Sequence, residues 1–172
     1  MRTIRSTTVT LAAAALAACA HSTPVAQPTA AADTSFAAMQ ERGKMAMGVD
    51  QYSSSHIFEP LPDGGRIVLQ RNAPDTAGTG TIRAHLASIA AAFAEGDFDL
   101  PGFVHGETVP GTAVMAAQRN EITYTMDTLP RGGEVMIRTS DSTAVAAVHE
   151  FLAYQRHAHH AMAHDSTGMM AH

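Results

Sequence analysis

Apolar residues recur every three or four positions in three segments of the chain, which is the spacing of amphipathic helices. In the middle segment the recurring positions include Ile82, Leu86 and Phe93, and Gly96 follows as a stop signal. The first and last segments begin after a Thr, Ser or Asp that can cap a helix. The three predicted helices span residues 34–47, 79–95 and 141–156, and the last pattern extends toward His164.

Other segments alternate apolar and polar residues, as half-buried strands do. Ile122, Tyr124 and Met126, for example, have polar neighbours on both sides. Gly-Gly turn signals follow Pro62 and Pro130, so each is expected to close a hairpin. The five predicted strands span residues 56–61, 66–71, 112–118, 121–129 and 134–139, and residues 97–110 are predicted to form a loop.

The order of these elements is helix, hairpin, helix, three-stranded meander, helix. This order predicts an α+β domain with an antiparallel sheet of about five strands and two or three helices packed on one face. The domain is expected to span residues 34–156, which is long enough for one hydrophobic core and too short for two domains.

The first 18 residues are predicted to be a signal peptide that is removed. Arg2 and Arg5 precede an apolar run of about ten residues, whereas a membrane-spanning helix needs about 20. The sequence Leu16-Ala17-Ala18-Cys19 resembles the lipobox of bacterial lipoproteins. This resemblance implies that Cys19 becomes the first residue of the mature chain and that its sulfur carries a diacylglycerol. The alternative is an ordinary signal peptide with an incidental cysteine.

Lipid chains on Cys19 would anchor the protein on the periplasmic side of a membrane. In Gram-negative lipoproteins an Asp after the cysteine marks retention in the inner membrane, and here Ala20 follows, so the outer membrane is favoured. Residues 19–33 contain two prolines and many small residues, which predicts a flexible tether between the lipid and the domain.

The amino-acid composition excludes several classes of protein. A hydrophobic share of 45% against 16% charged residues excludes a wholly disordered chain, and a single cysteine excludes an internal disulfide framework. The net charge is −5. Removal of Arg2 and Arg5 leaves nine Lys and Arg against sixteen Asp and Glu, a net charge of −7, which argues against nucleic acid as a partner.

Histidine and methionine stand out, with ten residues of each type. Five histidines and three methionines lie in residues 157–172, which form a His/Met-rich tail beyond the predicted domain. If the last helix continued, His160 and His164 would have the i, i+4 spacing at which two imidazoles bind one metal ion. The predicted metal ligands are His157, His159, His160, His164, Met162, Met169 and Met170.

The ligand types indicate which metal to expect. Imidazole suits Cu(II), Ni(II) and Zn(II), and thioether suits Cu(I). A mixed tract in an exported protein therefore favours copper, with zinc or nickel next. The alternative is a polar tail whose histidines have no metal role.

Two further positions hold candidate chemistry. His105 and Glu107 lie in the predicted loop, where they would act as a ligand pair or as a base and the group that orients it. Met45 and Met47 form another candidate group with His56 and have the spacing of Met-rich copper motifs. A helix points the two methionines about 200° apart, which favours one core Met and one Met at the helix end.

His85 and His149 lie at the edges of helical apolar stripes and are interpreted as structural. The sequence contains no H-E-x-x-H, G-x-S-x-G, G-x-G-x-x-G or GxxxxGK[ST] motif. Sequence motifs therefore give no support for metalloprotease, hydrolase or nucleotide-binding chemistry.

The blocks MGVDQY, LPDGGRI, VPGTAVMAA, LPRGGE and VAAVHEFLAYQ resemble a group of small bacterial exported proteins. The resemblance covers most of residues 45–155, and some members carry the label aspartate carbamoyltransferase. True carbamoyltransferases use a Ser-Thr-Arg-Thr loop, which does not occur here, so no catalytic residue is carried over.

Three hypotheses follow for the function. The leading one is an envelope lipoprotein that captures a transition metal, copper first, through its tail. The second is a module that docks an envelope protein partner and has no metal role. The third is an enzyme that uses the loop with His105 and Glu107.

Overall fold

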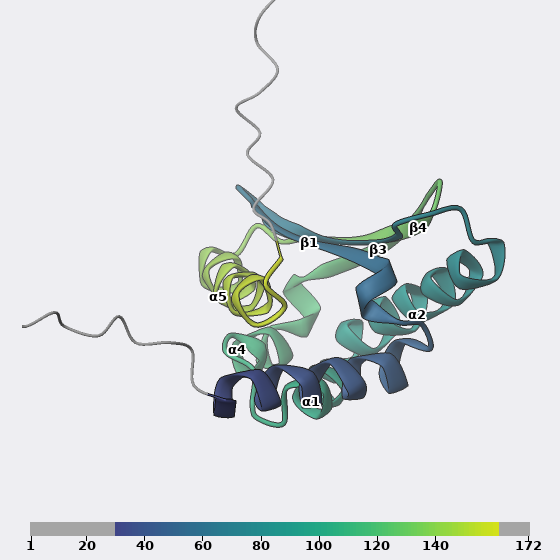
Figure 1. Ribbon diagram of the computed structural model, residues 1–172. Helices are drawn as coiled ribbons and strands as arrows, with labels where there is room; N and C mark the ends of the chain where they lie inside the picture. Colours follow the sequence, from purple (N-terminus) through teal and green to yellow (C-terminus); the bar gives the residue numbers. More distant parts are fainter. Residues whose placement is uncertain (1–29, 162–172) are drawn as a thin grey trace, which may run out of the picture.

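The computed structural model describes residues 30–161 of the 172-residue chain (Figure 1). Four strands form one sheet, and the helices lie on one side of it. In chain order the elements are α1 (Ala30–Met47), the short 3-10 helix η1 (Gln51–Ser53), β1 (Ser54–Leu61), β2 (Gly64–Arg71), α2 (Thr76–Ala94), α3 (Asp99–His105), α4 (Thr112–Ala117), the 3-10 helix η2 (Arg119–Glu121), β3 (Thr123–Leu129), β4 (Gly132–Arg138) and α5 (Ser142–Ala158).

The sheet consists of two hairpins joined through their second strands, in the order β1-β2-β4-β3, with every pair antiparallel. Both predicted hairpins are confirmed. A Cβ at Gly64 would lie 2.0 Å from the carbonyl oxygen of Ile137, and one at Gly132 would lie 1.9 Å from that of Leu69. Glycine at these two positions therefore lets each hairpin turn pack closely against the central strand of the other hairpin.

Helices α2 and α5 cover the inner face of the sheet, α2 against β3 and β4 and α5 against β1 and β2 (Figure 1). An aromatic cluster fills the space between them. Phe93 of α2 meets Phe151 of α5 edge-on, with ring centres 5.8 Å apart, and Phe98 stacks on Phe93 at 4.4 Å. Burial of these rings supplies much of the hydrophobic stabilisation of the core.

Helix α1 lies farther from the sheet and contacts α3 and the start of α2. The Arg42 Nε–H of α1 donates to the carbonyl oxygen of Val104 at 2.8 Å. Met39 and Met47 are buried on the inner side of α1. α1 therefore closes a space whose opposite wall is the inner face of the sheet.

The α+β class, the antiparallel sheet and the placement of helices on one face are confirmed, but the strand count differs from the prediction. Residues 112–118 form α4 and its cap instead of a strand, which leaves four strands in the described chain. Residues 113–117 are a continuous apolar run, whose period does not distinguish a strand from a buried helix. Gly111, at φ 82°, packs against the backbone of Ala147, and Met115 is fully buried.

The helix count is also higher than predicted. The described residues contain five α-helices where two or three were predicted, and α3 occupies part of the predicted loop 97–110. α1 begins at Ala30, four residues before the predicted domain start. No helix among residues 30–161 is long and apolar enough to cross a membrane.

The predicted continuation of the last helix is wrong within the described residues. α5 ends at Ala158, His159 caps it, and His160 adopts a left-handed backbone at φ 50°. A left-handed residue after the cap is a common way for a helix to end. His157 and His160 therefore do not continue along one helical face.

Candidate functional site

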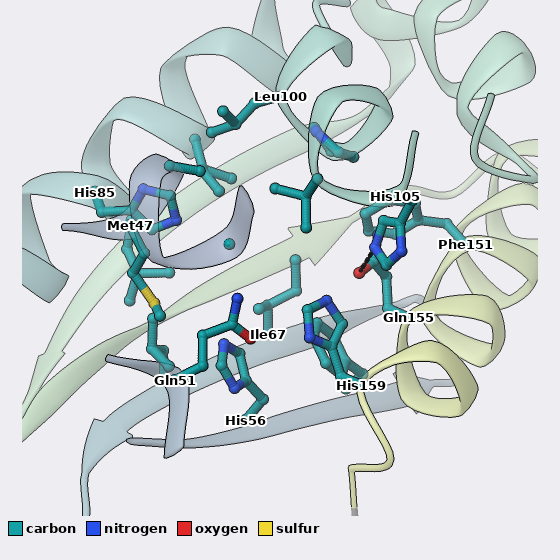
Figure 2. Close-up of a pocket in the computed structure, with 18 of the residues that line it drawn as sticks. Met47, Gln51, His56, Ile67, His85, Leu100, His105, Phe151, Gln155 and His159 are labelled. Carbon is teal, nitrogen blue, oxygen red and sulfur yellow. Dashed lines mark hydrogen bonds between the residues drawn. The ribbon is translucent and has the colours of Figure 1, made fainter. Parts of the chain in front are cut away.

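A cavity of about 90 Å³ lies between α1, α2, α3, the end of α5 and the sheet (Figure 2). Its walls are mainly apolar, and its polar lining comes from imidazole and amide side chains. A concave, mostly apolar site with a few convergent polar groups is typical of a ligand site. The polar side chains that line the cavity are His56, His85, His105, His159, Gln51 and Gln155.

Each histidine reaches the cavity from a different element. His56 lies on β1 two residues before Phe58, so strand alternation puts both on the inner face. His85 precedes the buried Leu86 on α2 and hydrogen-bonds the backbone of Ala46. His105 and His159 reach the cavity from the ends of two helices, α3 and α5.

His105 is the last residue of α3, where Gly106 at φ 73° ends the helix. His159 caps the end of α5. The side chain of His159 lies between those of His56 and His105 (Figure 2). Residues separated by more than 100 positions thus meet because the end of α5 crosses the inner face of β1.

The three imidazoles of His56, His159 and His105 form a row (Figure 2). The ring centres of His56 and His159 are 5.1 Å apart with an interplanar angle of 23°, and those of His159 and His105 are 5.1 Å apart at 87°. His105 Nε2 lies 3.0 Å from Gln155 Oε1. Because the amide oxygen accepts, His105 carries its proton on Nε2, and its Nδ1 is left as an acceptor.

Burial keeps these imidazoles uncharged near neutral pH. Desolvation, with a smaller contribution from His85, lowers the pKa of His56 from its ordinary 6.5 to about 4. Desolvation and the neighbouring His56 and His105 lower the pKa of His159 to about 3. Burial also lowers the pKa of His85 and of His105. Neutral imidazole is the form that coordinates metal ions.

Two buried polar atoms at the cavity have no hydrogen-bond partner among the described residues, Nδ1 of His159 and Oε1 of Gln51. The Gln51 amide lies against Gly43, where a Cβ would approach its Nε2 to 1.3 Å. Glycine at this position of α1 therefore makes room for the amide beside the cavity. Buried polar atoms without partners are costly and call for an explanation, of which a bound ion or ligand is one.

Within residues 30–161, no Asp, Glu, Lys or Arg lines this cavity. Glu107 accepts a hydrogen bond from the Tyr154 hydroxyl and lines a separate, open cleft. His105 bonds Gln155 instead. His105 and Glu107, which the sequence suggested as a pair, therefore have different hydrogen-bond partners, although the charge of Glu107 raises the pKa of His105.

The imidazoles do not form a finished metal site. In the chain between residues 30 and 161, no three His, Cys, Asp or Glu side chains converge on one point as ligands. His56 and His159 lie nearly face to face, and the lone pair of an imidazole nitrogen lies in the ring plane. One ring must therefore turn before both can bind the same ion.

The predicted tail ligands divide into separate groups. His159 enters the cavity, while His157 is exposed on the last turn of α5. His160 stacks on Phe36 of α1, with ring centres 4.3 Å apart. The predicted lipidation site and the remaining tail ligands lie outside the described residues: Cys19, Met162, His164, Met169 and Met170.

The other candidate residues have structural explanations. His149 Nε2 lies 2.9 Å from the carbonyl oxygen of Leu61, which fits its predicted structural role. Met47, the last residue of α1, is buried and lines the cavity, whereas Met45 is 67% exposed, so the two methionines do not meet at one site. The structural interpretation of His85 is incomplete, because its side chain also lines the cavity.

The sequence placed His56 with Met45 and Met47 in one candidate group, and the structure brings His56 and Met47 to the same cavity, but sequence reasoning missed Gln51. The signal for His56 was present: it shares the strand face of Phe58, so an imidazole in that register points inward. No sequence signal marks Gln51, because its position depends on the packing of Gly43 in α1.

Comparisons with protein-family models, with curated proteins and with solved structures found no match for this chain. We therefore interpret the site from the positions of its own side chains.

Proposed function

We propose that the protein is an envelope lipoprotein that binds a transition metal, copper first, and that the histidine cavity is the folded part of its site. The observation that carries this proposal is the row of three uncharged imidazoles of His56, His159 and His105 in one apolar cavity. Imidazole is the commonest metal ligand of proteins, and it suits copper, with zinc and nickel next.

The tail has a supporting role in this proposal. The exposed His157 lies on the last turn of α5, two residues before His159. The other tail ligands, Met162, His164, Met169 and Met170, follow it in the sequence. We propose that these side chains capture the ion and that the cavity retains it. Cys19 would anchor the protein by its lipid in the outer membrane, on the periplasmic side, where copper from outside the cell arrives first.

The two alternative functions have less support. The enzyme hypothesis needs His105 and Glu107 to act together, and they have different partners. The protein-docking hypothesis relies on isolated exposed apolar residues, Met45, Tyr52 and Phe103, and scattered exposed apolar side chains are normal.

Titration of the full-length chain with Cu(I), Cu(II), Zn(II) and Ni(II) tests the proposal. Every protein carries Cys19→Ser, because a free thiol would bind copper by itself. The cavity variant carries His56→Asn and His105→Asn. The matched tail variant carries His157→Asn and His164→Asn, so that both lose two imidazoles.

We expect binding tighter than about 10 μM in the parent protein. We expect the cavity variant to lose most of this affinity and the tail variant to lose little at equilibrium while binding more slowly. Equal losses in both variants, or no tight binding by the parent, would contradict the proposal. Circular dichroism of both variants checks that each is folded.

A further inference from the structure

We infer that the histidine cavity selects a monovalent soft ion, Cu(I), over the divalent ions Cu(II), Zn(II) and Ni(II). This inference rests on the proposed function and adds the oxidation state of the metal. Three features of the cavity support it: its lack of charge, its ligand types and the spacing of its imidazoles.

The first feature is charge. In the part of the chain that the structure describes, the side chains that line the cavity are neutral, and Glu107 lines another cleft. The charges of Glu107 and Arg42 act on His105 in opposite directions, Glu107 raising its pKa and Arg42 lowering it, so they partly offset each other. The cost of moving an ion into an apolar site grows with the square of its charge, so an uncompensated divalent ion is disfavoured far more than a monovalent one.

The second feature is ligand type. The thioether of Met47 lines the same cavity as the imidazoles, and thioether and imidazole ligands together suit Cu(I). Nδ1 of His159 has no partner among the described residues. Nδ1 of His105 is an acceptor, because its Nε2–H is donated to Gln155. An Nδ1 that makes no hydrogen bond among the described residues therefore stands on His159, beside the acceptor Nδ1 of His105.

The third feature is spacing. A metal–nitrogen bond of about 2 Å puts the centres of two coordinating imidazoles about 5–6 Å apart. The ring centres of His159 and His105, and those of His159 and His56, are 5.1 Å apart. The spacing of each adjacent pair therefore allows rotation of the rings to bring His159 and one neighbouring imidazole to the same ion. Cu(I) accepts so few ligands, whereas divalent ions need additional ligands, which the apolar walls do not supply.

The test uses the full-length chain with Cys19→Ser. The tail ligands are replaced as well, by His157→Ala, His164→Ala, Met162→Leu, Met169→Leu and Met170→Leu. Cu(I) affinity is measured under anaerobic conditions by competition with a coloured Cu(I) chelator, and Zn(II) affinity with a coloured Zn(II) indicator. We expect Cu(I) to bind at least about 1,000-fold more tightly than Zn(II). His56→Asn should weaken Cu(I) binding, while His149→Gln, which alters a histidine outside the cavity, should not.

A second variant tests the charge argument directly. Gln155→Glu places a carboxylate beside His105 at nearly constant volume. We expect it to raise Zn(II) affinity at least about tenfold and to reduce the preference for Cu(I). Copper K-edge absorption of the tail-replaced protein should show two or three nitrogen or sulfur ligands.

The outcomes separate the two proposals. Zn(II) binding that equals Cu(I) binding and that is lost in His56→Asn would overturn the selectivity and leave the proposed function intact. Metal binding that is unchanged by His56→Asn and by Gln155→Glu would overturn both. Four or more oxygen ligands around copper would also contradict the selectivity, whether or not the variants fold.

Discussion

His157 and His159 are two residues apart in a tract that looks uniform in the sequence, yet they occupy different environments. His157 is exposed on the last turn of α5, whereas His159 is largely buried between His56 and His105. The difference arises because α5 ends at Ala158 and the chain turns at His160. A density of histidines in the sequence therefore does not locate a site, because the fold decides which imidazoles meet.

The largest expected effect is on the stability of the aromatic core that contains Phe93. Phe93 is 1% exposed and contacts the rings of Phe98 and Phe151, so Phe93→Ala should lower the free energy of unfolding by about 3–5 kcal/mol. Phe103→Ala is the matched control, because Phe103 is 48% exposed and should cost under about 1 kcal/mol. Urea unfolding followed by circular dichroism measures both, and similar losses would contradict the assignment of the core.

The next effect is the pH dependence of stability. The pKa of His56 is about 4 in the folded protein and 6.5 in the unfolded chain. Between these values the unfolded chain binds a proton that the folded protein does not, so the free energy of unfolding falls as the pH decreases from 6.5 to 4. The expected loss from His56 is about 3 kcal/mol.

The variant His56→Phe isolates this contribution. It removes the titrating group and keeps a ring of similar shape beside Phe58 and His159. The difference in unfolding free energy between the variant and the parent should therefore grow as the pH falls from 6.5 to 4. Parallel pH curves for the two metal-free proteins would show that His56 is not buried in its neutral form.

A smaller effect is expected when the exposed His157 and the buried His159 are replaced one at a time. His159→Asn should weaken Cu(I) binding about 100-fold, because a ligand of the cavity is lost, and His157→Asn should change it less than about threefold. Competition with a coloured chelator measures both affinities in the full-length chain with Cys19→Ser. If His157→Asn has the larger effect, the binding site is the tail.

The smallest effect is expected at Glu107. Its carboxylate accepts a hydrogen bond from Tyr154 and lines a separate cleft, so Glu107→Gln should change Cu(I) affinity less than about twofold. A tenfold loss in the same competition assay would show that the carboxylate reaches the metal.

The sequence predicted the parts of the fold that depend on local periodicity. Ile82, Leu86 and Phe93 marked α2 correctly, and the two Pro-x-Gly-Gly turns marked both hairpins. The segment of α4 was wrongly predicted because an apolar run as short as Val114 to Ala117 has no distinctive period. Its helix depends on packing against α5, which is a tertiary contact.

The site was less predictable than the fold. His105 and His159 were both candidates, but for different sites, and nothing local to either position indicates that they meet. Their contact depends on where two helices end, and helix ends are set by caps and packing as much as by periodicity. His56 was a candidate beside Met45 and Met47, and its strand register indicates that it points inward, whereas the place of Gln51 depends on the glycine that faces it.

The most direct test of the central claim is a titration of the ¹⁵N-histidine-labelled full-length chain, carrying Cys19→Ser, with Cu(I) under anaerobic conditions. Side-chain nitrogen spectra report which imidazoles coordinate the ion. The account predicts that the first equivalent shifts the resonances of His56, His105 and His159 and leaves that of His157 in place. A first equivalent that shifts His157 and His164 and leaves the three cavity histidines unchanged would contradict it.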